Sequence, residues 1–319
     1  MNPRILALAG GVGGARLLEG LYHALGPGEL TAVVNGGDDF EHLGLRICPD
    51  LDTVLYTLAG LADPERGWGR RDETWSFMET LGQLGGPAWF RLGDRDLALH
   101  AERTRRLAGG ERLTPIMADI GARLGVRATL LPMSDALVPT IVETDAGDLP
   151  FQEYFVARRC EPAIRRLRYM GASSAAPPPE FFRALASDRL EAIIICPSNP
   201  FLSIAPILAV GGLRAALRAA AVPVIAVSPL IQGKAVKGPA ARIMADFDVP
   251  PTPAGVAGTY AGLIDTLVID DADIGAAQPG DGIRTFHCPT LMSGRAERLR
   301  LASFVLDCIA RIGSPGPRP

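Results

Sequence analysis

Aromatic side chains, histidine and cysteine are all scarce in this sequence of 319 residues. Phe, Trp and Tyr make up 6% of the chain, and its four histidines show no metal-ligand spacing such as His-Glu-x-x-His. The five cysteines are an odd number without a Cys-x-x-Cys pair, so neither a disulfide framework nor a zinc site is expected. The formal net charge of −3 provides no overall basic field, which argues against a nucleic-acid partner.

Long membrane-spanning runs and a signal peptide are also missing from the sequence. The apolar stretch after Arg4 covers only residues 5–9 before the glycines begin. Residues 193–213 carry no charge, but three prolines divide them into a strand, a loop and a helix. The arginines Arg103, Arg105 and Arg106 are expected on a solvated helix face, with a local phosphate-binding patch as the alternative. We therefore expect a cytoplasmic protein with no membrane partner.

Glycine and proline are plentiful, with 36 and 27 residues, which favours many tight turns between strands and helices. Residues 5–9 form a continuous apolar run that is typical of a buried parallel strand, and leucines follow at helical spacing over 15–25. A second apolar run covers 30–34. This opening predicts an α/β fold that is Rossmann-like and doubly wound, with a mostly parallel sheet.

Later segments fit a single α/β domain over residues 1–319. Residues 53–125 have helical periodicity and are expected to form a mainly helical insertion, whereas 139–143 and 149–154 predict a hairpin. Further strands are expected at 128–131, 193–196, 224–227, 267–270 and 283–287, and helices at 204–221 and 293–312. Gly313 is expected to end the last helix, and the tail 314–319 is expected to be flexible.

Glycine-rich and polar segments follow several predicted strands, at the edge where open α/β sheets bind ligands. The clearest is Gly-Gly-Val-Gly-Gly at 10–14, whose backbone N–H groups and following helix N-terminus suit an anion. Counted from Gly11, the third glycine of a dinucleotide-binding G-x-G-x-x-G is replaced by Arg16, and no Walker Gly-Lys-Ser/Thr follows. A tight turn without a ligand is the alternative.

Carboxylates accompany this loop: Asp38 and Asp39 follow the second strand, and Asp50 and Asp52 lie further along. Such a group of carboxylates beside a phosphate-binding loop suits Mg²⁺, which takes oxygen ligands from carboxylates and phosphates together. The alternative is that Asp50 or Asp52 caps a helix that begins near Thr53.

Four further segments supply polar groups on turns, at 90–96, 131–135, 196–200 and 228–234. Each is as easily structural as functional when taken alone, but their convergence on one sheet edge favours a function. No covalent nucleophile is predicted, because Ser198 and Cys196 have no adjacent histidine in sequence and no nucleophile-elbow pattern.

Taken in order, these segments resemble the CofD-type 2-phospho-L-lactate transferases of deazaflavin coenzyme F-420 biosynthesis. The resemblance covers nearly the whole chain and rests on a combination: Pro-Asp-Leu-Asp-Thr at 49–53, Leu-Gly-Asp-Arg-Asp at 92–96 and Pro-Ser-Asn-Pro at 197–200. It implies a Mg²⁺-dependent homodimer that acts on a deazaflavin alcohol and a guanylylated phospholactate or phosphoenolpyruvate. The ribityl hydroxyl attacks the guanosine-diphosphate-activated donor, and GMP leaves.

The resemblance implies deazaflavin contacts from Asp52 and Arg91, and the chemistry of the residues suggests further roles in a reaction that needs alignment and charge neutralisation more than a covalent partner. Deazaflavin contacts are expected from Asp52, Arg91 and Asp94, and catalysis from Asp52 and Asp50. Mg²⁺ is expected on Asp39 and Asp50. Nucleotide and phosphate contacts are expected from Gly10, Gly11, Gly13, Gly14, Ser198, Asn199 and Lys234.

Two other functions compete with this one. A non-catalytic regulatory protein that binds nucleotide sugars on the same core would keep the glycine loop, but it would have no reason for Asp52, Arg91 and Asp94. A nicotinamide oxidoreductase is disfavoured by Arg16. The residues do not decide whether the donor carries lactate, enolpyruvate or glycerate.

Overall fold

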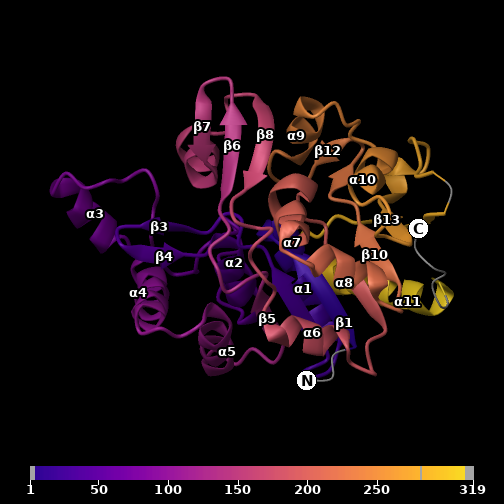
Figure 1. Cartoon of the computed structure of the whole chain (residues 1–319), viewed down its shortest axis with the longest axis horizontal. Helices are drawn as coiled ribbons and strands as arrows, with labels where there is room; N and C mark the ends of the chain where they lie inside the picture. The colour runs from indigo at the N-terminus through magenta and orange to yellow at the C-terminus, as the bar shows by residue number, and fades with distance from the viewer. Residues whose placement is uncertain (1–3, 281, 313–319) are drawn as a thin grey trace.

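The chain is built around a seven-stranded sheet in a computed structural model that describes residues 4–280 and 282–312 (Figure 1). All neighbouring strands of this sheet are parallel, in the order β14-β13-β10-β9-β1-β2-β5. The strands are β1 (Ile5–Ala9), β2 (Leu30–Val34), β5 (Thr129–Pro132), β9 (Ala192–Ile195), β10 (Val224–Val227), β13 (Thr266–Ile269) and β14 (Arg284–His287). The expected Rossmann-like, doubly wound sheet is confirmed.

The direction in which the chain adds strands reverses between β1 and β9. From β1 the chain proceeds outward through β2 to β5, and it then returns to the other side of β1 to lay down β9 and the remaining strands. Such a switch point leaves a crevice outside the carboxyl ends of the two central strands, because the connections leave in opposite directions. The loops that follow β1 and β9 therefore define the expected ligand site.

Helices cover both faces of the sheet, as the apolar strands require. The side chains of β1 are fully buried and alternate between two hydrophobic cores, with Ile5, Ala7 and Ala9 on one face and Leu6 and Leu8 on the other. The first face is covered by α1 (Gly11–Ala24), α2 (Pro49–Leu58), α5 (Leu113–Arg123) and α11 (Arg295–Ile312). The second face is covered by α6 (Pro179–Leu185), α7 (Ala205–Ala209), α8 (Leu213–Ala219), α9 (Ala240–Asp246) and α10 (Pro253–Thr259).

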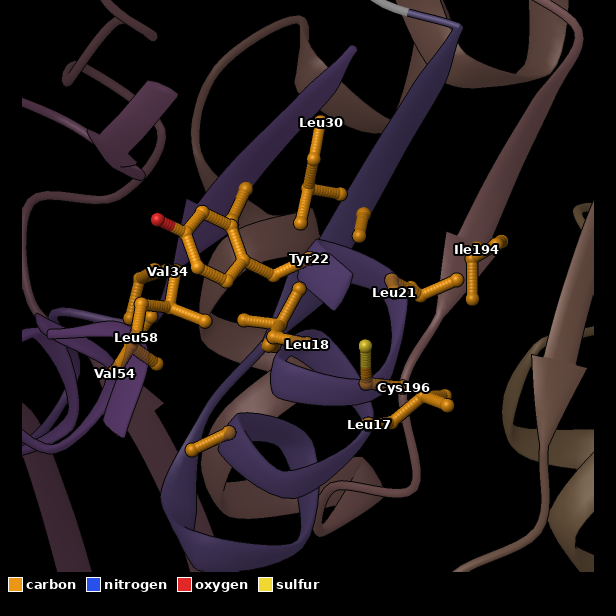
Figure 2. Close-up of a cluster of buried hydrophobic side chains, with 14 of the residues drawn as sticks. Leu17, Leu18, Leu21, Tyr22, Leu30, Val34, Val54, Leu58, Ile194 and Cys196 are labelled. Atoms are coloured by element: carbon orange, nitrogen blue, oxygen red, sulfur yellow. The ribbon is translucent and has the colours of Figure 1, made fainter. Parts of the chain in front are cut away.

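Helix α1 is held by the first of these cores (Figure 2). Its buried residues recur at helical spacing, and they pack against the neighbouring strands and helix α2. The labelled side chains in Figure 2 are Leu17, Leu18, Leu21 and Tyr22 of α1, Leu30 and Val34 of β2, Val54 and Leu58 of α2, and Ile194 and Cys196 at β9. This packing fixes the N-terminus of α1, which lies at the switch point.

The region between β2 and β5 contains the expected helices, but only part of it stands apart from the sheet. Helices α2 and α5 pack on the main core. Helices α3 (Ser76–Gln83) and α4 (Asp94–Ala108) project to one side with a small hairpin, β3 (Phe40–His42) and β4 (Leu45–Ile47) (Figure 1). They share a satellite core around Ile47, Met78 and Leu92.

A second, antiparallel sheet lies beside the switch point (Figure 1). The expected hairpin is present as β6 (Thr140–Thr144) and β7 (Gly147–Pro150), but residues 153–157 coil into a short π-helix instead of extending β7. Strand β8 (Ile164–Tyr169) pairs with β6 and was not expected, because its arginines obscure the apolar alternation.

The helix expected over 204–221 is broken. A π-helical turn (Pro200–Ile204) leads into α7, and Gly212, at φ +79°, separates α7 from α8. Within residues 4–280 and 282–312, no single helix is long and apolar enough to span a membrane; the pair Pro200–Ala209 and Leu213–Ala219 meets those criteria only jointly, with a bend of 87°. The closing helix is confirmed as α11, whereas its stop at Gly313 and the tail 314–319 lie outside the described residues.

Candidate active site

A cavity of about 520 Å³ opens at the switch point between β1 and β9. Its lining comes from the turns after β1, β2, β9 and β10, from α2 and α4, and from residues 68–69 and 236–240. Of the four additional polar segments, 90–96, 196–200 and 228–234 contribute lining residues. Segment 131–135 does not contribute any: Ser134 and Asp135 make hydrogen bonds to Ala176 and Thr114 that hold other loops.

The glycines after β1 form the first turn of α1 rather than a loop before it. The helix begins at Gly11, not at residue 15, and Gly11 has a φ of +65° that favours glycine. A Cβ on Gly13 would clash with the carbonyl oxygen of Pro197, so the loops after β1 and β9 touch here. Gly10, Gly11 and Gly13 line the cavity, whereas Gly14 is buried behind it against Ser198.

Ser198 and Asn199 tie the β9 loop to its surroundings. Ser198 Oγ accepts a hydrogen bond from Gly10 N–H at 3.1 Å and donates one to the Gly10 carbonyl at 2.8 Å. Asn199 Oδ1 accepts from the N–H groups of Phe201 and Leu202. The amide Nδ2 of Asn199 is buried without a hydrogen-bond partner among the described residues, although Asn199 lines the cavity. Asn199 therefore has a free donor for a ligand, whereas the Ser198 hydroxyl is already engaged.

Two buried carboxylates meet beside Gly10 and Gly11. The Asn35 amide donates to Asp50 Oδ2 at 2.9 Å and to Asp38 Oδ1 at 3.3 Å, and Gly11 N–H also bonds to Asp50. Burial raises the pKa of Asp50 to about 6. Burial and the charge of Asp50 raise the pKa of Asp38 well above its ordinary value. These oxygens, with little neutralising charge nearby, suit a divalent cation shared with a bound phosphate.

Asp39, which was expected to hold this cation with Asp50, points elsewhere. It is absent from the cavity lining, and its Oδ2 lies 3.5 Å from Arg46 Nη2. Burial raises the pKa of Asp39 to about 7, against the opposing charge of Arg46. Asp38 therefore occupies the position beside Asp50 that the sequence interpretation gave to Asp39.

Helix α2 carries both Asp50 and Asp52 in its first turn. It begins at Pro49, and the residue before it, Cys48, makes no capping hydrogen bond through its side chain. The alternative in which either aspartate caps a helix that starts near Thr53 is therefore wrong. Both carboxylates are instead buried and line the cavity.

Asp52 forms a buried ion pair with Arg103 of α4. Arg103 Nη1 donates to Asp52 Oδ1 at 2.5 Å, and Nη2 donates to Oδ2 at 3.0 Å. Arg103 is 0% exposed and also donates to the carbonyl of Arg46. The expectation that Arg103 lies on a solvated helix face is wrong, because Asp96, His100 and Arg103 follow at i, i+4 and i+7 on the inner side of α4.

Tyr56, Asp96 and His100 extend this ion pair along the cavity wall. The Tyr56 hydroxyl donates to Asp96 Oδ1 at 2.5 Å, and His100 Nε2 lies 3.4 Å from the same oxygen. Burial works to raise the pKa of Asp96, but hydrogen bonds and charge from His100 and Tyr56 lower it on balance. His100 Nδ1 lies 2.9 Å from Arg103 Nη2. The sequence interpretation assigned no role to these three residues, although the i, i+4 pairs 52/56 and 96/100 give both helices one polar face.

Oxygen and nitrogen atoms of Asp52, Asp96 and His100 lie within 4.8 Å of one another, a spacing that a metal ion would accept. Both oxygens of Asp52 already accept hydrogen bonds from Arg103, so the Arg103 guanidinium would repel a metal ion bound at this position. We therefore assign this group, with Tyr56 and Arg103, to a separate unit, the α2–α4 cluster. The residues around the first turn of α1 form a second unit, the glycine-loop cluster. It consists of Gly10, Gly11, Gly13, Asn35, Asp38, Asp50, Ser198 and Asn199.

The remaining expected residues divide between the cavity and the surface. Arg91 lines the cavity, and its guanidinium lies 4.2 Å from the ring centroid of Trp75. Asp94 lies outside the lining, where it accepts hydrogen bonds from Thr74 and from the N–H groups that begin α3. Lys234 is an exposed residue of the hairpin strand β12 (Lys234–Ala235) and is also outside the lining, whereas Lys237 is part of it.

Aromatic side chains line the cavity around the α2–α4 cluster and the antiparallel sheet. Trp68 and Phe90 come from the region between β2 and β5, and Phe151 and Phe155 follow β7. Phe151 and Phe155 stack with ring centroids 5.4 Å apart. In a chain with few aromatic residues, this concentration suits a planar, partly apolar ligand such as a fused ring system.

The chain is similar to known proteins over most of its length. A family model described as 2-phospho-L-lactate transferase CofD matches residues 5–280. A phosphoenolpyruvate transferase from Streptomyces griseus is 43% identical over 298 residues, which cover 91% of this chain and 93% of the relative. One of the same name from Mycobacterium tuberculosis is 40% identical over 315 residues, covering 91% and 94%.

Among solved structures, a member of the upf0052 family from Bacillus halodurans superimposes with a TM-score of 0.61. The match covers 96% of this chain and 99% of the other, at 16% identity, so it concerns the fold alone. The family model and the relatives extend over most of the chain and confirm the resemblance seen in its motifs. The chain therefore belongs to the 2-phospho-L-lactate transferase CofD family.

Proposed function

We propose that this protein transfers a phosphoenolpyruvyl group, or its phospholactyl counterpart, from a guanosine-diphosphate-activated donor to the terminal ribityl hydroxyl of a deazaflavin, with release of GMP. Of the two donors, we favour the enolpyruvyl one because relatives that are 43% and 40% identical are named phosphoenolpyruvate transferases. The observation that carries the proposal is the composition of the cavity. One wall is a glycine-lined anion site with two acids, and another is an aromatic wall with an oriented carboxylate.

The glycine-loop cluster is assigned to the diphosphate of the donor. The N-terminus of α1 presents backbone N–H groups and a partial positive charge, and Asn199 Nδ2 adds a donor that no described residue engages. Mg²⁺ fits this cluster because the buried Asp38 and Asp50 carboxylates lie together and are poorly neutralised. Bound there, the ion would neutralise charge that develops on the phosphate oxygens.

The α2–α4 cluster is assigned to the acceptor. Arg103 holds Asp52 through both oxygens, which leaves each oxygen further lone pairs to accept a hydrogen bond from the ribityl hydroxyl. A carboxylate paired in this way acts chiefly by orienting the hydroxyl, and a loose phosphoryl-transfer transition state needs little prior deprotonation. The aromatic residues around it are assigned to the deazaflavin rings.

The reaction then requires no covalent intermediate. The hydroxyl oxygen forms a bond to the phosphorus that carries the organic acid, and the bond from this phosphorus to the GMP oxygen breaks. GMP leaves with the bonding electron pair, and the hydroxyl proton is released to water as the new bond forms. No described residue is needed as a strong general acid, because a phosphate monoester is a good leaving group.

Incubating the protein with deazaflavin alcohol, Mg²⁺ and each guanylylated donor tests the proposal. Chromatography should show GMP and the phosphodiester product in equal amounts. Among the enolpyruvyl, lactyl and glyceryl donors, the enolpyruvyl donor should react fastest. GMP formation that does not depend on deazaflavin, or no GMP with any donor, would contradict the transfer reaction. Light scattering in the same buffer would test the homodimer that the resemblance implies.

A further inference from the structure

Arg16 is a cavity-lining arginine to which neither the motifs nor the proposed reaction gives a role. It lies three and four residues after Gly13 and Val12 on α1, so it shares their face, and all three line the cavity. Among the described residues, the Arg16 side chain has no hydrogen bond or ion pair. The carboxylate of Glu19, one turn further along α1, is instead paired with Arg298 of α11. The guanidinium therefore has its donors free.

The surroundings of Arg16 are positively charged. Burial and the charge of Arg298 lower the pKa of Arg16, and burial together with Arg16 lowers the pKa of Lys237. Lys237 lines the rim of the cavity, and its ammonium donates to the Arg66 carbonyl at 2.8 Å, which leaves its charge unneutralised. Neither cation has a carboxylate partner among the described residues, so the two repel each other, and an anion bound beside them would stabilise both.

The cation pair, Arg16 and Lys237, lies apart from the acid pair, Asp38 and Asp50. Asp50 abuts Gly10 at the start of α1, whereas Arg16 lies more than one turn along the helix. A loop over residues 63–70, closed by a bridge between Ala62 and Arg70, carries Trp68 into the cavity lining. Its Gly67 lies so close to Val12 and Lys237 that a Cβ there would clash with the ammonium. The cations therefore lie between the glycine loop and an aromatic wall.

We infer that Arg16, assisted by Lys237, binds the carboxylate of the organic acid on the donor, and so selects acid-bearing donors. This inference rests on the proposed function. The donor brings a diphosphate and a carboxylate, and the acid pair with its cation serves only the diphosphate. The organic acid is joined through its C2 oxygen to the phosphorus under attack, so its carboxylate lies close to the diphosphate, and Arg16 and Lys237 line the cavity next to the glycine loop. A guanidinium fork matches a carboxylate with two parallel hydrogen bonds.

Titration calorimetry with two matched esters of guanosine diphosphate tests this. The lactyl ester carries the carboxylate, and the isopropyl ester has a methyl group in its place. Both are titrated with Mg²⁺ present and deazaflavin absent, and GDP serves as reference. Wild-type protein should bind the lactyl ester about 10- to 100-fold more tightly than the isopropyl ester, because hydrogen bonds to charged groups have about this effect.

Arg16→Gln should abolish most of this preference and leave GDP and the isopropyl ester within about threefold of wild type. Arg16→Lys should keep part of it, and Lys237→Gln should lose a smaller part. Arg71→Gln, an exposed arginine outside the cavity, is the matched control and should change nothing. Unchanged GDP affinity shows that each variant is folded.

The inference would be overturned if Arg16→Gln lowered the affinity for both esters equally. It would also be overturned if the wild-type protein bound the two esters with the same affinity. The outcome for the reaction itself is separate. Binding that depends on the carboxylate, with no GMP release when deazaflavin is added, would support the anion site while contradicting the proposed transfer.

Discussion

The glycine-loop cluster and the α2–α4 cluster share one cavity but treat their carboxylates in opposite ways. In the first, the hydrogen-bond donors to Asp38 and Asp50 among the described residues are amide and N–H groups, and burial raises the pKa of each carboxylate. In the second, the Asp52 carboxylate is neutralised by Arg103 through two hydrogen bonds. The described residues therefore offer the carboxylates of the first cluster no cationic partner, whereas the Asp52 carboxylate of the second has one.

This difference separates the two roles in the proposed reaction. A cluster with uncompensated charge gains stability when Mg²⁺ and a diphosphate arrive together, so it suits binding of the donor. A cluster with internal compensation holds one carboxylate in a fixed orientation, so it suits alignment of the acceptor hydroxyl. Variants that interrupt one cluster should leave the other intact.

The largest effect is expected from breaking the pair between Asp52 and Arg103. Asp52→Asn should lower turnover by roughly 100-fold, the effect of losing the alignment of a reacting group. Arg103→Met should do the same, because Asp52 would lose its orientation. Each variant also leaves one buried charge alone, so the free energy of unfolding should fall by about 3–5 kcal/mol. Steady-state kinetics and denaturant unfolding measure the two losses.

The control for this prediction is the double variant Asp52→Asn with Arg103→Met. Its loss of unfolding free energy should be clearly smaller than the sum of the single losses, because no unpaired charge remains. GDP affinity should stay near normal in all three variants. A strong loss of GDP affinity would show that the two clusters are not independent.

The next largest effect is expected from Gly13→Ala in the glycine-loop cluster. The added methyl group would clash with the Pro197 carbonyl and push the β1 and β9 loops apart. Overpacking of this kind costs about 1–3 kcal/mol, and GDP affinity should fall with it. Gly82→Ala on α3, where a Cβ meets nothing within 4 Å, is the matched control and should bind GDP normally. Calorimetry with GDP measures the difference, and equal affinities in both variants would contradict the role of the loop contact.

The two clusters also differ in how far the sequence predicts them. Ser198 and Gly10 are 188 residues apart, yet their contact follows from topology, because the turns after adjacent parallel strands must meet. The buried apolar strands β1, β2 and β10 are equally predictable, since a continuous apolar run has few other uses. Asp39 was expected beside Asp50 where the structure has Asp38, because strand order does not set the direction in which a side chain of a turn points.

The α2–α4 cluster depends on how helices between β2 and β5 pack, and no rule of sheet topology fixes that. Asp52 was identified from its motif, but its partner Arg103 was assigned to solvent, since three arginines within four residues usually mark an exposed face. The i, i+4, i+7 spacing of Asp96, His100 and Arg103 contained the information, but a buried polar face and an exposed one look alike in sequence.

A smaller effect is expected from pH on the acid pair. A cation binds Asp50 only when the carboxylate is ionised, and its pKa is raised to about 6. The affinity for Mg²⁺, measured by calorimetry in the presence of GDP, should therefore rise about tenfold between pH 5 and pH 7. Asp38→Asn should reduce this affinity more than Asp39→Asn. The reverse order would restore Asp39 as the ligand.

The same raised pKa values govern the metal-free protein. An aspartate with an ordinary pKa of 3.8 in the unfolded chain and about 6 or 7 when folded keeps its proton longer in the folded state. The free energy of unfolding, measured in the presence of a chelator, should therefore fall as the pH rises through about 4 to 7. Added Mg²⁺ should offset this loss at neutral pH. A thermal midpoint that rises over this range in chelator would contradict the raised pKa values.

The smallest effect is expected from Lys234→Gln. Lys234 was assigned to the nucleotide from its place in the segment after β10, but its side chain is exposed and lies outside the cavity lining. An exposed ammonium away from the ligand is screened by water and salt, so GDP affinity and turnover should not change measurably. Lys237, three residues later, lines the rim and should influence binding of the acid-bearing donor. Calorimetry on the two single variants with the lactyl ester compares them directly, and a larger loss for Lys234→Gln would show that the hairpin turns toward the ligand when the donor binds.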